Sequence, residues 1–167
     1  TDARLQRLVE PERDFNAVVR LDPQTRLSDW VEENLADLLT RCRSDQALTI
    51  EEVDRRLAAY LDDLFDGLPE RVSLRPALAG NSLHHDWWLA RRDLPGLVQR
   101  VNYRMLDVSS WKVHWKHALG KNAFKKENLE LVRQYYPGEL PAGASERHDA
   151  YFDVLASMAE MNFYTSH

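Results

Sequence analysis

The stretch ALAGNSLHHDWWLARR, residues 77–92, predicts a short buried strand followed by a helix. Residues 77–79 form a small apolar run, and the glycine and Asn81 that follow are typical of a turn. The helix is expected from about residue 86 to residue 92. In open α/β sheets, ligands bind outside the carboxyl ends of strands, so an aspartate in the position of Asp86 is a candidate metal ligand. Taken alone, Asp86 is better explained as a solvated helix residue.

Strand and helix patterns alternate along much of the chain. MLDVS, residues 105–109, predicts a second buried strand, and DFNAVVRLD, residues 14–22, predicts a strand with residues 3–10 as a candidate partner. Helices are expected from the cap residues Ser28 and Thr49, and over about residues 111–118, 126–135 and 149–164. This order indicates an α/β fold with a mixed sheet, and not a helical bundle.

Length and composition predict one globular domain over residues 1–167. The chain is 44% hydrophobic and 29% charged, and it contains no apolar run of the roughly 18 to 20 residues that a membrane span needs. A net charge of −5 argues against a broad basic surface that coats duplex nucleic acid, but it is compatible with a small nucleic-acid substrate. The single cysteine fits a reducing compartment.

SERHDAYFDVL, residues 145–155, contains a histidine and an aspartate five positions apart. On an ideal helix, that separation turns two side chains roughly 140° apart, so His148 and Asp153 would not share a helical face. They converge on one pocket only if His148 lies in the loop before the helix that carries Asp153. The spacing alone leaves both arrangements open. His114 and His117 share a helical spacing, but the nearby sequence offers no third metal ligand, which favours a solvated face. The lysines near residues 121–126 could contact phosphates or simply form another solvated face.

Three segments, taken in order, resemble the oligoribonuclease family of DEDDh 3′-to-5′ exonucleases. GNSLHHD (residues 80–86) matches the family's G-N-S-x-x-x-D segment, and YRMLDVSS (residues 103–110) matches its Y-R-x-L-D-V-S strand. HDAYFDVLASMAEMNFY (residues 148–164) matches its H-x-x-x-x-D helix with the A-E-x-x-x-Y continuation. The resemblance covers essentially the whole chain.

This resemblance implies a ribonuclease H-like fold, in which helices flank a mixed sheet, and metal-dependent hydrolysis of short single-stranded RNA. Asp86 and Asp153 would bind Mg²⁺ or Mn²⁺, and His148 would be the general base that deprotonates the attacking water. The family likeness also suggests residues that contact the substrate: Asn81, Ser82, Tyr103 and Arg104. It further implies a homodimer located in the cytoplasm or the mitochondrion.

One part of the family pattern is missing from these residues. The family's D-x-E motif, which supplies two of its four metal-binding carboxylates on the first strand, has no counterpart, so the fold is expected to lack its N-terminal strand. Glu10-Pro11-Glu12 is no substitute, because proline suits a turn better than the centre of a strand. Two hypotheses follow: an exoribonuclease, or a catalytically inactive subunit with a structural or RNA-binding role in a larger RNA-containing complex.

Overall fold

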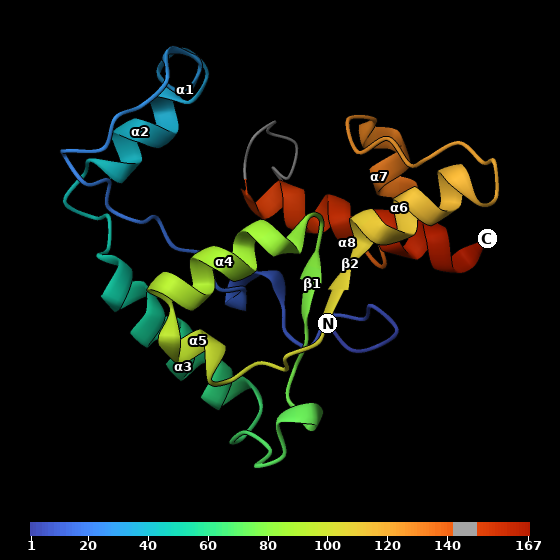
Figure 1. The fold of residues 1–167 in the computed structure, drawn as a ribbon, viewed down its shortest axis with the longest axis horizontal. Helices are drawn as coiled ribbons and strands as arrows, with labels where there is room; N and C mark the ends of the chain where they lie inside the picture. Colours follow the sequence, from blue (N-terminus) through green and yellow to red (C-terminus); the bar gives the residue numbers. More distant parts are fainter. Residues whose placement is uncertain (142–149) are drawn as a thin grey trace. The chain divides into compact units, whose positions relative to one another are not determined.

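A computed structural model describes residues 1–141 and 150–167. The described chain divides into two compact units (Figure 1). Unit 1 combines Thr1–Asp14, Ala77–His85 and the described residues of Arg104–His167, and unit 2 combines Phe15–Pro76 with Asp86–Tyr103. The prediction of a single domain over the whole length remains a prediction.

Unit 1 contains the sheet, which consists of two short parallel strands. Strand β1 (Leu78–Gly80) pairs with β2 (Met105–Asp107), with Gly80 opposite Asp107. The carboxyl ends of parallel strands meet at the same edge of a sheet, so the residues after Gly80 and Asp107 lie together. The helical elements of unit 1 are η1 (Pro11–Arg13), α6 (Val108–His117), α7 (Leu129–Tyr135) and α8 (Ala150–Ser166).

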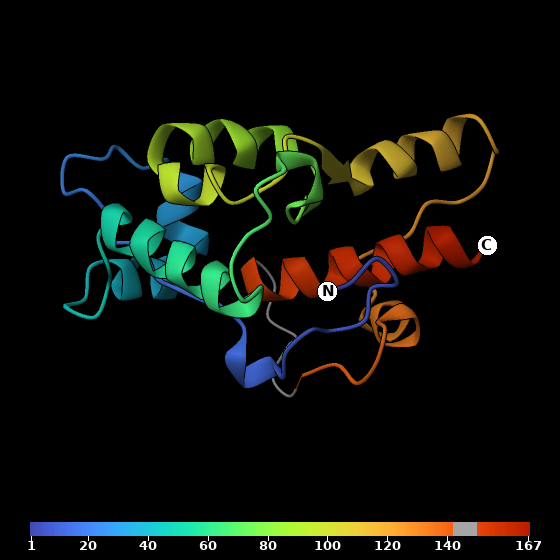
Figure 2. The same ribbon diagram turned by 90° about the horizontal axis from the view of Figure 1, so that it is seen from below.

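Helix α8 forms the centre of unit 1. It packs against α6, α7 and β1, and in Figure 2 it lies between α6 and α7. Its buried side chains join those of the neighbouring elements in one core: Val108, Trp115, Phe124, Val132, Tyr136, Leu155, Ala156, Ala159, Met161 and Tyr164. The N-terminal segment is tied to this core, because Asp14 accepts hydrogen bonds from Arg7 and from the Tyr151 hydroxyl.

Unit 2 is built from helices and turns. Its elements are α1 (Asp29–Asn34), α2 (Ala36–Cys42), α3 (Ile50–Leu64), η2 (Val72–Leu74), α5 (Pro95–Val98) and most of α4 (Leu83–Asp93). Helix α3 packs against α5. The Asp54 carboxylate accepts hydrogen bonds from the backbone N–H groups of Gly96 and Leu97 at 2.8 and 2.9 Å, so it caps the start of α5.

The two predicted helix caps are confirmed. The Ser28 hydroxyl accepts from the Val31 N–H, and the Thr49 hydroxyl accepts from the Glu52 N–H. The stretch after Ser28 forms two helices and not one, because Leu35 leaves the helical conformation with φ −123° and ψ 29°.

The two strands predicted near the start of the chain are wrong. Residues 14–22 form an isolated bridge, Val19 to Leu48, and their backbone groups bond to Leu48 and Cys42 and not to a strand ladder. Residues 3–10 begin in a turn, where Asp2 Oδ1 accepts from the N–H groups of Arg4 and Gln6, and Leu5 adopts a φ of +62°. An extended pattern becomes a strand only where a partner backbone is available.

The predicted α/β class is confirmed, with helices flanking a small parallel sheet. In the described ranges, no helix has both the length and the apolar composition that crossing a membrane requires.

Candidate active site

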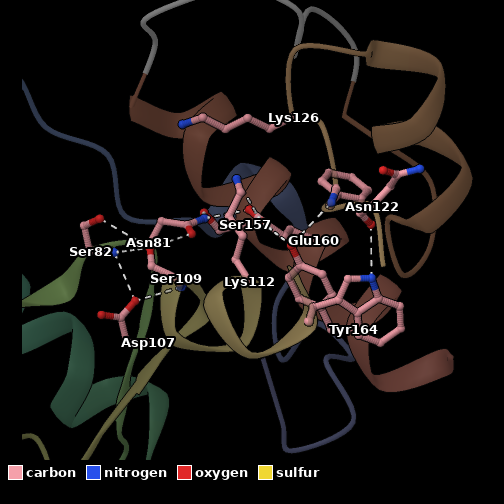
Figure 3. Close-up of polar contacts among 12 residues, drawn as sticks. Asn81, Ser82, Asp107, Ser109, Lys112, Asn122, Lys126, Ser157, Glu160 and Tyr164 are labelled. Atoms are coloured by element: carbon pink, nitrogen blue, oxygen red, sulfur yellow. Dashed lines mark hydrogen bonds and ion pairs between the residues drawn. The ribbon is translucent and has the colours of Figure 1, made fainter. Parts of the chain in front are cut away.

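The carboxyl ends of β1 and β2 are joined by a cluster of polar side chains (Figure 3). Asp107, the last residue of β2, accepts at Oδ1 from the N–H groups of Ser82 and Ser109, at 3.1 and 2.9 Å. The Ser82 N–H also reaches the Ser109 hydroxyl at 2.9 Å. Ser82 has a φ of +55°, a conformation that is costly for a residue with a side chain and that these hydrogen bonds hold in place.

Asn81 connects this cluster to helix α8. Its Nδ2 group donates to Ser157 Oγ at 2.9 Å and to Glu160 Oε2 at 3.1 Å, while its Oδ1 accepts from the Ser109 hydroxyl at 3.0 Å. Figure 3 shows Asn81 between the serine cluster and the side chains of α8. Both ends of the amide are therefore occupied by hydrogen bonds inside unit 1.

Glu160 is completely buried, with a relative exposure of 0%. Its Oε1 atom accepts from the Tyr164 hydroxyl at 2.9 Å and lies 3.3 Å from Lys112 Nζ. Tyr164 in turn accepts from the Phe124 N–H at 3.3 Å. Burial, together with the hydrogen bond to Glu160, raises the pKa of Tyr164 well above its usual range, so this phenol stays protonated at neutral pH.

Asp153 lies in the first turn of α8, one turn before Ser157. The Ser157 hydroxyl donates to the Asp153 backbone carbonyl at 2.8 Å, and the Asp153 carboxylate accepts from Lys126 Nζ at 3.0 Å. The Asp153 side chain is 49% exposed. A half-exposed carboxylate at this place is accessible to a ligand and is held by the same helix that carries Glu160.

The other predicted site residues fall in different parts of the structure. Asp86 is exposed in the first turn of α4 and belongs to unit 2, whereas Asp153 belongs to unit 1. Tyr103 and Arg104 are exposed just before β2. His148 lies outside the described residues. Of the predicted set, the structure brings Asn81 and Ser82 together at the strand ends and links them through Ser157 to the helix of Asp153.

The described residues do not assemble a metal site. Across residues 1–141 and 150–167, no group of three or more histidine, cysteine, aspartate or glutamate side chains is placed to hold an ion. His114 and His117 are exposed on α6. The carboxylates of Asp107 and Glu160 already accept hydrogen bonds from protein donors, so these two side chains act as structural acceptors at the strand ends.

Asp107 and Glu160 belong to the polar cluster but were not predicted from the sequence as site residues. For Glu160 a signal exists, because it lies four residues after Ala156 and four before Tyr164, which places a charged residue on an otherwise apolar helical stripe. For Asp107, the pattern of a strand followed by Asp-x-Ser indicates a helix cap. Neither signal identifies the distant residue that donates to the carboxylate, which is Asn81 for Glu160 and Ser82 for Asp107.

Comparison with known proteins identifies relatives that are oligoribonucleases. No family model matches the chain. A probable oligoribonuclease of Schizosaccharomyces pombe is 30% identical over 172 residues, which cover all of this chain and 58% of that protein. The mitochondrial oligoribonuclease of Homo sapiens is 26% identical over 145 residues, covering 83% of this chain and 50% of the relative.

The oligoribonuclease of Mycobacterium ulcerans is 30% identical over 136 residues, covering 78% of this chain and 54% of that protein. The chain thus spans about half the length of the curated relatives that it matches. Its small parallel sheet with flanking helices is consistent with a ribonuclease H-like exonuclease fold. The chain is therefore a homologue of the oligoribonucleases.

Proposed function

We propose that this protein is a 3′-to-5′ exoribonuclease of the oligoribonuclease type, which hydrolyses short single-stranded RNA. The observation that carries the proposal is a similarity to a probable oligoribonuclease that extends over all of this chain. The position of the polar cluster supports it, because ligands of α/β proteins bind at the carboxyl ends of strands. Asp153 is connected to those strand ends through Ser157 and Asn81.

The proposed chemistry requires Mg²⁺ or Mn²⁺, with Asp86 and Asp153 among the ligands and His148 as the general base. Hard divalent ions prefer carboxylate oxygens, and a histidine of ordinary pKa can accept a proton at neutral pH. Asp86 and Asp153 are two carboxylates, fewer than a normal two-metal site uses, so this chemistry requires further carboxylates. A homodimer in the cytoplasm or the mitochondrion completes the proposal.

A second candidate is a catalytically inactive exonuclease fold that binds RNA or has a structural role in an RNA-containing complex. The observation that favours it is the missing counterpart of D-x-E in these residues, together with the absence of a three-ligand group among those that the structure describes. On this hypothesis, the polar cluster at the strand ends would support a binding surface alone.

The deciding experiment measures cleavage and binding separately. The full-length encoded protein is incubated with 5′-labelled RNAs of two to five nucleotides in Mn²⁺, and the products are resolved by length. We expect stepwise shortening from the 3′ end, lost with EDTA and reduced by on the order of 10²-fold or more in Asp153→Asn, since losing a metal-binding carboxylate weakens stabilisation of the transition state by several kcal/mol.

The control is Glu130→Gln, which changes an exposed carboxylate on α7 that the proposal does not use. RNA binding without cleavage would favour the inactive subunit. If the protein neither binds nor cleaves RNA, both the exoribonuclease and the RNA-binding subunit are excluded.

A further inference from the structure

We infer that Asn81 and Glu160 are positioning residues, whose hydrogen bond holds the first turn of α8, and with it Asp153, against the carboxyl ends of β1 and β2. The catalytic consequence of this inference rests on the proposed exoribonuclease function, whereas the structural link does not. On this assignment, Asn81 acts inside the protein and does not contact the substrate.

Glu160 occupies an unusual place for a carboxylate. It is the one charged residue that is buried in the part of the chain that the structure describes. Removing a carboxylate from water is costly unless donors replace the lost hydration. Asn81, Tyr164 and Lys112 supply three such donors from three different elements. A buried charge satisfied in this way favours one arrangement of its neighbours, because displacing a donor leaves part of the carboxylate without a hydrogen bond.

The orientation of the Asn81 amide follows from Glu160. A carboxylate offers acceptors alone, so the Asn81 Nδ2 group must face Glu160, and Oδ1 must then face the Ser109 hydroxyl. That hydroxyl contacts the Ser82 N–H in the turn after β1. The acceptor on α8 thereby sets the direction of the hydrogen bond that joins the turn after β1 to the start of α6.

The link continues to Asp153 through one more side chain. Ser157 Oγ accepts from Asn81 and donates to the Asp153 carbonyl, at 2.9 and 2.8 Å. Asp153 is thus one helical turn from the point where Asn81 anchors α8. A shift of this anchor would displace the carboxylate, and displacements near 1 Å can cost on the order of 10²-fold in rate.

The test reverses the polarity of one hydrogen bond. Glu160→Gln replaces one acceptor oxygen with an amide group that donates, next to the donors of Asn81, Tyr164 and Lys112. Asn81→Asp places a second carboxylate beside Glu160. The double variant Asn81→Asp with Glu160→Gln restores one donor opposite one acceptor and keeps an acceptor for Ser109. It does not restore the donor to Ser157, whose single hydroxyl hydrogen already bonds to the Asp153 carbonyl. Glu130→Gln, an exposed glutamate on α7, is the matched control.

Two measurements are made on the full-length protein at a temperature where every variant is folded. For RNA cleavage, each single variant is expected to lower kcat by roughly 10- to 100-fold with KM nearly unchanged, and the double variant is expected to recover part of the loss. For backbone hydrogen exchange, the first two turns of α8 should exchange faster in each single variant than in the wild type, and the double variant should lie between them.

Several results would overturn the inference. Unchanged kcat per folded molecule in the single variants would reduce the cluster to a structural role. A raised KM with unchanged kcat in Asn81→Asp would assign Asn81 to substrate contact. If the wild-type protein cleaves no RNA, the proposed function fails. The structural link from Asn81 and Glu160 to the first turn of α8 is then tested by hydrogen exchange alone, and unchanged exchange of α8 in the single variants would reject it.

Discussion

Lys126 Nζ lies 3.0 Å from Asp153 Oδ1, so a lysine from the segment before α7 holds the carboxylate in the first turn of α8. Both side chains are partly exposed, at 39% and 49%. Ion pairs in such positions are screened by water and by salt, and typically contribute about 0 to 1 kcal/mol. The contact therefore orients Asp153 more than it stabilises unit 1.

Replacing Lys126 is expected to have a small and salt-dependent effect. Lys126→Gln should lower the free energy of unfolding by less than about 1 kcal/mol at low ionic strength, and the difference should shrink in high salt. Urea denaturation at two salt concentrations measures it, with the exposed Lys125→Gln as control. A loss of several kcal/mol would contradict this description of the pair.

Tyr164 is expected to make the protein less stable at alkaline pH. Its folded pKa is raised above the ordinary value of 10.0, so its contribution to stability is complete below pH 10 and is lost as the pH rises from there toward the folded pKa. The stability advantage of the wild type over Tyr164→Phe should narrow above pH 10 by at most about 1.4 kcal/mol per pH unit. Denaturation series between pH 8 and about 11 measure the difference in unfolding free energy between the wild type and Tyr164→Phe. A difference that stays constant with pH would be evidence against the raised pKa of Tyr164.

Leu155 and its neighbour Val154 test the packing of α8. Leu155 is 1% exposed and Val154 is 58% exposed. Leu155→Ala should cost about 2 to 5 kcal/mol, because it removes buried methyl groups and leaves a cavity, whereas Val154→Ala should change stability by about 0.5 kcal/mol or less. Thermal unfolding of both variants checks the orientation of the helix, and comparable losses would show that it is wrong.

The close contact between Gly96 and Asp54 in unit 2 can be tested by substituting each residue and both together. A Cβ atom on Gly96 would lie 2.9 Å from Asp54 Oδ2 and 3.2 Å from the Ala58 Cβ. Gly96→Ala should therefore destabilise the protein by about 1 to 3 kcal/mol. In an Asp54→Ala background the same change should cost less, because the carboxylate that it crowds is gone. A double-mutant cycle in urea measures this coupling, and strict additivity would contradict it.

Local signals in the sequence account for the parts of the fold that were predicted correctly. Ser28 and Thr49 cap helices through hydrogen bonds that span three residues, so the necessary information lies within each stretch. The break at Leu35 has no such signal, because this residue continues the apolar stripe. The predicted strand at residues 14–22 failed because pairing depends on a partner from elsewhere in the chain.

The candidate site shows the same difference between features that local sequence predicts and contacts that it does not. The sequence identified Asn81, Ser82 and Asp153 as candidates for one site, and the structure joins them through Ser157. The helical spacing of Glu160 reveals that it faces the core, but not that its partner is Asn81. Hydrogen bonds between distant side chains depend on the tertiary fold, which no local pattern contains.

The hydrogen bond between Asn81 and Glu160 joins residues that are 79 positions apart. Contacts of such long range slow folding, because the chain must close a large loop before the contact stabilises anything. In contrast, α3 and α5 of unit 2 both precede α6, α7 and α8 in the chain. During synthesis the helices of unit 2 can therefore pack before α8 has left the ribosome, and the strand-end cluster is completed last.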